Sequence, residues 1–167
     1  MIYYTKFKSP IGTLGLVCDD EYLLRILLPN EEISVQNLQK LYPTEVITEN
    51  NSGFKDVISQ LTEYFDGKRK QFDIKTKMEI TSFYKKALSE VVKVPYGTTL
   101  SYGKIAQQIN SPKAARAVGT ANARNPLPII IPCHRIITKN GKLGGYAGGL
   151  KMKEYLLDLE SKNINIL

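Results

Sequence analysis

The sequence is poor in the residues that bind metal ions or form disulfide bonds. Among its 167 residues there are two cysteines, Cys18 and Cys133, and one histidine, His134. Two cysteines cannot build a disulfide framework, and these three residues are too few for a zinc site of the cysteine–histidine type. We therefore expect reduced thiols, no bound metal and no cofactor.

Long apolar runs are lacking as well. The longest uncharged apolar stretch, Leu127–Cys133, is far shorter than the ~20 residues that a membrane-spanning helix needs. Lys6 and Lys8 interrupt any secretion signal at the N-terminus. Apolar residues make up 43% of the chain and charged residues 23%, as in ordinary globular proteins. These features predict a cytoplasmic protein that does not contact membranes.

Acidic residues are scarce in the second half of the chain. Residues 1–75 hold 9 basic and 11 acidic residues, a net charge of −2, whereas residues 76–167 hold 14 basic and 5 acidic residues, a net charge of +9. No acidic residue lies between Glu90 and Glu154. Surfaces normally carry both signs, so this segment indicates an anionic partner, with nucleic acid favoured over a small anion or a membrane surface. A basic bias of the whole proteome would not explain the acidic first half.

Residues 1–75 are predicted to form an N-terminal α/β domain with a structural role. Apolar runs separated by turn residues predict a meander of antiparallel strands, and apolar residues at helical spacing predict two helices after it. A further strand is expected at Gln71–Ile74. The three expected strands of the meander are Ile2–Phe7, Thr13–Cys18 and Tyr22–Leu28.

Residues 76–167 are predicted to form a mostly helical C-terminal domain. Ser101 is a candidate N-cap for a helix over Tyr102–Ile109, and Ser111-Pro112 is typical of a second helix start. Two short helices joined by a turn are a helix-turn-helix candidate. The four expected helices are Ser82–Val94, Tyr102–Ile109, Lys113–Ala123 and Leu150–Ser161.

The expected helix Lys113–Ala123 consists almost entirely of small residues, with Lys113 and Arg116 as its only long side chains. Small residues allow the helix backbone to approach DNA closely, and a lone arginine would then project into the base stack. The alternative is a helix packed tightly on its own core, with Arg116 simply in solvent. The acid-free surroundings favour the DNA-binding interpretation.

Cys133 and His134 follow an apolar run that is expected to be a buried strand, and Pro132 bends the chain just before the cysteine. A thiolate is the reactive form of cysteine, and we expect nearby His134 and Arg135 to lower the thiol pKa. Neighbouring residues of a strand face opposite ways, so His134 reaches the thiol only through the bend or through a water. A base of this kind also needs an acceptor on its second nitrogen, and the sequence leaves both Glu154 and Glu160 open.

Four glycines surround Tyr146 in the segment Gly144–Gly149. This composition is typical of a tightly turned loop that allows a ligand to approach the backbone. The segment lacks the spacing of a phosphate-binding loop. We interpret it as the rim of a pocket rather than as a flexible linker.

Several motifs together closely resemble the O6-alkylguanine-DNA alkyltransferases. The match is dense from about Phe83 to Glu160, and its Pro-Cys-His-Arg core is highly specific for that family. The first half resembles the family only loosely, through its meander and the Tyr64-Phe65-Asp66-Gly67 helix end. The motifs are Arg116-Ala117-Val118-Gly119, Asn125-Pro126, Pro132-Cys133-His134-Arg135 and Tyr146-Ala147-Gly148-Gly149.

The resemblance implies a role for each of the residues that match. Cys133 would be the nucleophile that accepts the alkyl group, and His134 its base, acting through a water. Glu160 would orient His134. Asn125 would brace the active-site turn, and Tyr102 would rotate the nucleotide and assist the leaving guanine. The residues expected to contact DNA or substrate are Tyr102, Ser111, Ala115, Arg116, Arg135, Tyr146 and Ala147, with Arg116 replacing the extruded base.

The resemblance also implies an α+β fold. Its N-terminal part would be a ribonuclease-H-like antiparallel sheet with helices, and its C-terminal part would resemble a winged helix-turn-helix. Ala147 departs from the family, because many members carry serine there and this chain has no side-chain donor to offer the substrate oxygen. Some members bind zinc in the first domain, but this one has only Cys18 and no histidine there.

The activity implied is DNA repair by direct, stoichiometric and irreversible transfer of an alkyl group from O6-alkylguanine to Cys133, with O4-alkylthymine as a second candidate substrate. The expected partner is double-stranded DNA with an alkylated guanine, bound by a monomer that is nucleoid-associated in a prokaryote. Two other interpretations remain. One is a noncatalytic helix-turn-helix protein that senses lesions or regulates genes, and the other is a Cys-His-Glu hydrolase of acyl groups.

Overall fold

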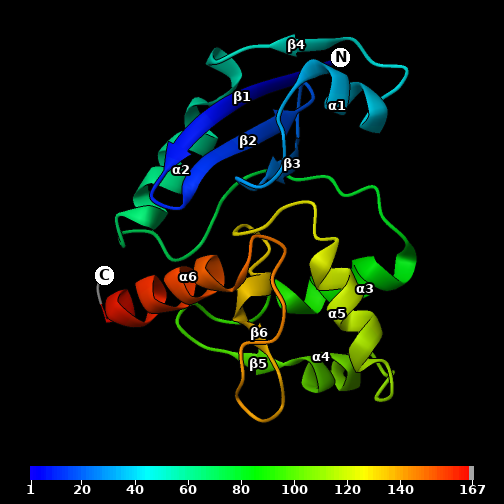
Figure 1. Ribbon diagram of the computed structural model, residues 1–167, viewed down its shortest axis with the longest axis vertical. Helices are drawn as coiled ribbons and strands as arrows, with labels where there is room; N and C mark the ends of the chain where they lie inside the picture. The colour runs from blue at the N-terminus through cyan, green and yellow to red at the C-terminus, as the bar shows by residue number, and fades with distance from the viewer. Residues whose placement is uncertain (166–167) are drawn as a thin grey trace. The chain divides into compact units, whose positions relative to one another are not determined.

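The computed structural model describes residues 1–165, and the chain forms two compact units, Met1–Met78 and Glu79–Leu167 (Figure 1). The first unit holds a mainly antiparallel sheet with helices and the second is mostly helical. The predicted α+β fold is confirmed. None of the helices within the described range is long and apolar enough to cross a bilayer.

The first unit is built on the predicted meander. Asp19 stabilises its second turn because its side chain accepts the backbone N–H groups of Glu21 and Tyr22 at 2.8 and 2.7 Å. A fourth, short strand pairs in parallel with the first strand and completes the sheet, in the order β3-β2-β1-β4. The strands are β1 (Ile2–Ser9), β2 (Gly12–Cys18), β3 (Leu23–Leu27) and β4 (Ile47–Glu49).

Helices bury both faces of this sheet (Figure 1). On one face, Tyr4 and Val17 pair across β1 and β2 and pack with Leu38 of α1 (Val35–Leu41). On the other face, Phe7 of β1 lies 6.5 Å from Phe65 of α2, ring centroid to centroid. A 3-10 turn, η1 (Ser52–Phe54), leads into α2 (Lys55–Phe65). Because successive side chains of a strand point to opposite faces, this one sheet contributes to a hydrophobic core on each of its sides.

The prediction of a strand at Gln71–Ile74 is wrong. The segment has no regular structure, and only Thr76 forms a bridge, to Leu23 of β3. Gln60 of α2 holds the segment instead, since its side chain donates to the carbonyl of Asp73 and accepts the Asp73 N–H, both at 2.9 Å. A side chain thus takes the hydrogen bonds that a neighbouring strand would have supplied.

As far as residue 165, the second unit contains four α-helices and a pair of two-residue strands. Ser101 caps α4 as predicted, because its Oγ accepts the Lys104 N–H at 3.1 Å. Helix α3 packs against both α4 and α5, and α6 packs against the turn that carries Cys133. The elements are α3 (Ser82–Val91), β5 (Leu100–Ser101), α4 (Tyr102–Gln108), α5 (Ala115–Ala123), β6 (Ile136–Ile137) and α6 (Leu150–Asn163).

Helix α5 starts later than Ser111-Pro112 predicts. Its N-cap is Ala114, and the preceding residues form a turn in which the Ala114 N–H donates to the carbonyl of Ser111 at 2.9 Å. Asn110 enters this turn with φ of 59°, a left-handed conformation that asparagine tolerates well. The proline therefore shapes the turn between α4 and α5 rather than the first turn of a helix.

Candidate active site

The apolar run before Cys133 is not the strand that was expected. It folds into a turn in which the Ile131 N–H donates to the carbonyl of Leu127 at 2.8 Å, and Ile129 has φ of 77°. Cys133–Arg135 then form a 3-10 turn, η2. Prolines at both ends of the run remove N–H donors, so it cannot pair as a central strand.

Asn125 holds this turn in shape. Its side-chain Nδ2 donates to the carbonyl of Ile131 at 2.8 Å, and its Oδ1 accepts the Leu127 N–H at 2.9 Å. The amide thus ties both ends of the loop that leads to Cys133. This is the position in which a bracing residue, as expected for Asn125, would lie.

A buried hydrogen-bonded group lies behind Cys133. His134 Nε2 is 2.7 Å from Oε1 of Glu160, and both side chains are fully buried. Glu154, the other carboxylate that the sequence left open, is exposed. Helix α6 brings Glu160 to His134 because Lys153, Leu156 and Glu160 share its inward face at helical spacing.

The ionisation of this group follows from its hydrogen bonds. The pKa of Glu160 falls to about 2 because His134 and Arg135 donate to its carboxylate, which outweighs the opposing effect of burial. Burial lowers the pKa of His134 below its usual value, although Glu160 opposes that shift. At neutral pH the histidine is therefore neutral and the glutamate ionised.

Arg135 lies elsewhere than the sequence suggested. Its side chain is 7% exposed and its guanidinium faces Glu160, not solvent, so the prediction that it contacts DNA is wrong. Ser111 also lies outside the pocket that holds Cys133. Its backbone N–H donates to the carbonyl of Ala106 at 2.9 Å within the turn between α4 and α5.

Cys133 is buried, with 4% of its surface exposed, yet it reaches the wall of a pocket of about 640 Å³. Burial raises the pKa of its thiol, and the Asn125 amide and the charge of Lys153 only oppose that rise. The expected lowering of the pKa is therefore wrong, because Arg135 points away and His134 is neutral. The resting residue is a thiol that needs a base to ionise.

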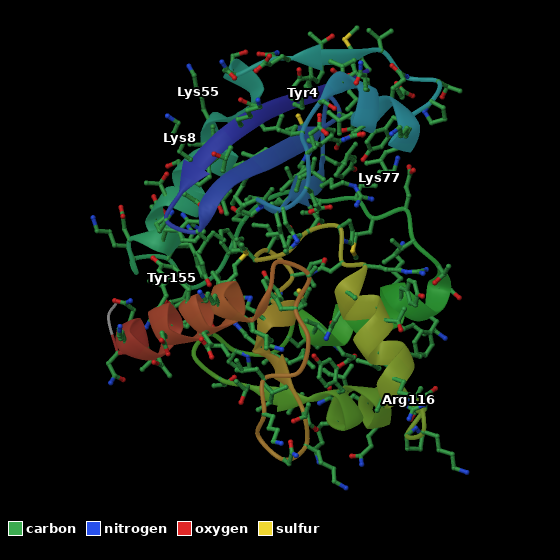
Figure 2. All side chains as sticks on the ribbon, viewed as in Figure 1. Tyr4, Lys8, Lys55, Lys77, Arg116 and Tyr155 are labelled. Carbon is green, nitrogen blue, oxygen red and sulfur yellow. The ribbon has the colours of Figure 1, made fainter. Side chains whose placement is uncertain are left out.

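The pocket brings together most of the residues that the sequence analysis selected. Helix α5 lines the pocket with its small residues, and the loop before α6 lines it as well. Figure 2 shows Arg116 near the beginning of α5, where its side chain is exposed. The selected residues that line the pocket are Tyr102, Ala115, Arg116, Cys133, Tyr146 and Ala147.

Tyr102 is fitted closely between two glycines. A Cβ on Gly144 would lie 2.9 Å from the Tyr102 hydroxyl, and one on Gly119 would lie 3.9 Å from its ring. Gly144 also has φ of 70°, which disfavours any residue with a side chain. The Tyr102 hydroxyl donates to the carbonyl of Gly145 at 3.4 Å, and burial raises its pKa, so it remains protonated.

Lys153 is a residue that the sequence analysis missed. It belongs to the segment without acidic residues that the sequence analysis assigned to an anionic partner, but it is fully buried on α6. Its Nζ donates to the carbonyls of Ile136 at 2.6 Å, of Gly145 at 3.1 Å and of Leu143. Desolvation lowers its pKa to about 8. The signal available in the sequence was its helical spacing from Leu156 and Glu160. This spacing places Lys153 on the same face of α6 as those two residues, so its side chain points inward.

The described residues offer no alternative metal chemistry. Within residues 1–165 no group of three or more His, Cys, Asp or Glu side chains could hold a metal ion. Cys18 of β2 is half-buried, and burial with nearby Asp19 and Asp20 raises its pKa to about 11. The thiol of Cys18 is therefore far less able to ionise than an ordinary cysteine.

Two known protein families match the chain. The one described as the DNA-binding domain of 6-O-methylguanine DNA methyltransferase matches residues 82–162, and the one described as its ribonuclease-like domain matches residues 2–78. The methylated-DNA–protein-cysteine methyltransferase of Methanosarcina acetivorans is 45% identical over 159 residues, which cover 95% of this chain and 98% of that protein. The protein of that name from Mycolicibacterium paratuberculosis is 41% identical over 164 residues, covering 98% and 94%.

Solved structures agree with these matches. The crystal structure of the O6-methylguanine methyltransferase of Mycobacterium tuberculosis is similar with a TM-score of 0.87 at 37% identity, covering 98% of this chain and 94% of that one. A crystal structure of a Mycobacterium tuberculosis protein in complex with DNA gives a TM-score of 0.87 at 37% identity, covering 96% and 94%. The similarity therefore extends over both units of this chain.

Proposed function

The chain belongs to the 6-O-methylguanine DNA methyltransferase family, and from that premise we propose that it repairs DNA by moving an alkyl group from O6 of guanine to Cys133. The observation that carries this proposal is the position of Cys133. Its side chain lines a pocket of about 640 Å³ together with Tyr102 and Arg116. A buried thiol beside a base, facing a cavity of this size, suits a nucleophile that receives one extruded nucleobase.

His134 is the proposed base. Its Nε2 is paired with Glu160, and within residues 1–165 its Nδ1 has no hydrogen-bond partner. Because an ionised carboxylate only accepts, Nε2 carries the ring proton and Nδ1 the lone pair. The thiol proton passes through a bridging water to Nδ1, and Glu160 stabilises the imidazolium that results.

The thiolate of Cys133 then attacks the saturated carbon of the alkyl group. A sulfur–carbon bond forms, the bond between that carbon and O6 breaks, and its electron pair stays on guanine. The hydroxyl of Tyr102 donates a hydrogen bond to the departing guanine, which later takes up a proton. Tyr146 lines the pocket for the base, and Ala147 leaves the substrate oxygen to backbone donors.

The product on the protein is a thioether. The base in this site acts on a thiol proton, and a thioether has no carbonyl that water could attack in a hydrolysis. Cys133 therefore stays alkylated, and each molecule repairs one lesion. The reaction therefore inactivates the protein. It needs no cofactor, because the alkylated guanine and Cys133 are the only reactants.

The second unit is proposed to open the DNA. An alkylated guanine inside a duplex must leave the stack before a thiolate reaches it, at a cost of a few kcal/mol. The small residues of α5 let this helix lie close to the DNA, and Arg116 fills the space of the extruded base. Residues 76–167 thus form the DNA-binding and acceptor domain, and residues 1–75 the structural domain, of a cytoplasmic monomer.

The proposal is tested by mass spectrometry of the protein after incubation with a duplex that contains one O6-methylguanine. We expect one added methyl group per molecule, located on the peptide with Cys133 and not on the peptide with Cys18. An unmodified protein that binds the lesion would instead indicate a noncatalytic sensor. Repeated turnover of an ester substrate without modification would indicate a hydrolase.

Arg116→Ala is expected to slow repair in duplex DNA by about tenfold to a hundredfold, because the extruded base would leave an empty step in the stack. Its reaction with the free alkylated base should stay within about twofold of wild type, since Arg116 is exposed and takes no part in the proposed proton transfer. The measurement is the second-order rate of alkyl transfer on both substrates. Lys113→Ala, which removes an exposed charge of the preceding turn, is the matched control. Equal losses on both substrates would exclude the role of Arg116 in extrusion.

A further inference from the structure

Within residues 1–165, the carboxylate of Glu160 receives at least four hydrogen bonds. Its Oε1 is 2.7 Å from His134 Nε2 and accepts from a terminal nitrogen of Arg135 at 2.8 Å. Its Oε2 accepts from Arg135 Nε at 2.9 Å and from the Gly97 backbone N–H at 3.1 Å. Each oxygen of the carboxylate thus faces two of these donors.

The guanidinium of Arg135 has further contacts besides Glu160. Its remaining terminal nitrogen donates to the carbonyl of Val94 at 2.7 Å, and its guanidinium carbon lies 5.6 Å from the centre of the Tyr96 ring. A fork of this kind on a buried carboxylate forms an ion pair with no net charge. The guanidinium faces the carboxylate and is almost without the exposure that a DNA contact would require.

We propose that Arg135 is a positioning residue that keeps His134 a neutral base with its lone pair on Nδ1. It does so by neutralising Glu160 while leaving that carboxylate able to accept the Nε2 proton. This inference rests on the proposed function only for its consequence, because the protonation of His134 can be measured without any alkyl transfer.

The physical reason lies in charge balance. Without Arg135, the imidazole would face a buried carboxylate with no counter-charge, and the pair would capture a proton near neutral pH. If His134 took that proton, it would become an imidazolium. If Glu160 took it, the carboxyl would donate to Nε2 and the ring proton would move to Nδ1. Either event removes the lone pair that accepts the thiol proton.

Few other charges act on this pair. The pKa of His134 is lowered by burial, raised by Glu160, and lowered again by Arg135 and by Lys153. Lys153 bonds to three backbone carbonyls rather than to Glu160, so it cannot replace the fork of Arg135. The remaining ionisable groups near the pair are Tyr96, whose pKa is raised by burial and Glu160, and the neutral thiol of Cys133.

The test is nitrogen-15 NMR of the imidazole, which is free of overlap because His134 is the chain's single histidine. In the wild-type protein we expect a neutral ring with the proton on Nε2 and unprotonated Nδ1 at about pH 7, and still mostly so at the ordinary histidine pKa of about 6.5. A ring that is charged at about pH 7, or that carries its proton on Nδ1, would overturn the proposal without any variant.

Two variants extend the test. In Arg135→Met we expect Nδ1 to become protonated in most molecules at about pH 7, whereas Arg135→Lys, which keeps the charge but not the fork, should retain a largely unprotonated Nδ1. An unprotonated Nδ1 in a folded Arg135→Met protein would refute the proposal. If that variant does not fold, a charged ring in the wild-type protein or a protonated Nδ1 in Arg135→Lys would still refute the proposal.

Kinetics separate positioning from mere support of the fold. The alkyl-transfer rate of Arg135→Met should fall by about a hundredfold at about pH 7 and recover as the pH rises, since the base must lose its extra proton first. If Arg135 only supported the fold, its substitution would lower the rate by the same factor at every pH. If wild-type protein transfers no alkyl group, the proposed function fails, yet the NMR result on His134 stands or falls independently.

Discussion

Replacing Cys133 with serine is expected to reduce alkyl transfer to less than about one thousandth of the wild-type rate. The hydroxyl of serine ionises far less readily than a thiol, and the neutral imidazole of His134 is too weak a base to deprotonate it without substrate activation. Oxygen is also a poorer nucleophile than sulfur toward a saturated carbon. The substitution shortens the side chain only slightly, so folding and DNA binding should persist.

Cys18→Ser provides the matched control for this substitution. Its sulfur lies in the first unit, outside the pocket, and the raised pKa of about 11 keeps it protonated. The variant should react at the wild-type rate, measured as transfer of a labelled methyl group from DNA to protein. Residual transfer in Cys133→Ser that disappears in the double variant would identify Cys18 as a second acceptor and contradict the assignment.

Lys153→Met is expected to slow alkyl transfer by about tenfold to a hundredfold and to lower the free energy of unfolding by about 1–3 kcal/mol. The ammonium ties β6 to the loop before α6 through the carbonyls of Ile136, Leu143 and Gly145. Methionine fills the space but leaves these carbonyls without a donor. The loop that carries Tyr146 and receives the Tyr102 hydroxyl would then lose its anchor.

The pattern of losses distinguishes this role from DNA binding. Because Lys153 is buried, Lys153→Met should lose similar factors on duplex DNA and on the free alkylated base, in contrast to Arg116→Ala. Lys151→Met is the control, since it removes an exposed charge from the same helix. Rates on both substrates and urea denaturation measure the two effects. A loss confined to duplex DNA would mean that Lys153 acts on DNA and not on the loop.

Much of the candidate site could be predicted from the sequence, because the relevant signals are local. Pro132-Cys133-His134 places a nucleophile next to a base, and Ser101 and the run of small residues in 113–123 predict two helices. The meander was equally readable, since turn residues separate its apolar runs. Such patterns act over one or two turns of chain, so no tertiary contact was needed to recognise them.

The features that the sequence could not determine all depend on packing between distant residues. Glu160 rather than Glu154 meets His134 only because α6 packs on η2 with its inward face fixed. The same packing turns Arg135 inward and buries Lys153, although the residue types alone suggested two solvent-exposed cations. A buried charge is stable only beside its partner, and that partner lies more than twenty residues away for Arg135.

The sequence by itself determined which atoms can react, since a thiol beside an imidazole and a basic segment free of acidic residues are properties of composition and order. The tertiary structure alone decided the protonation state and the accessibility of those atoms. Burial keeps the Cys133 thiol protonated and the His134 imidazole neutral, and the turn braced by Asn125 brings the sulfur to a pocket. Solvation and hydrogen bonding set a protonation state, and both exist only after the chain has folded.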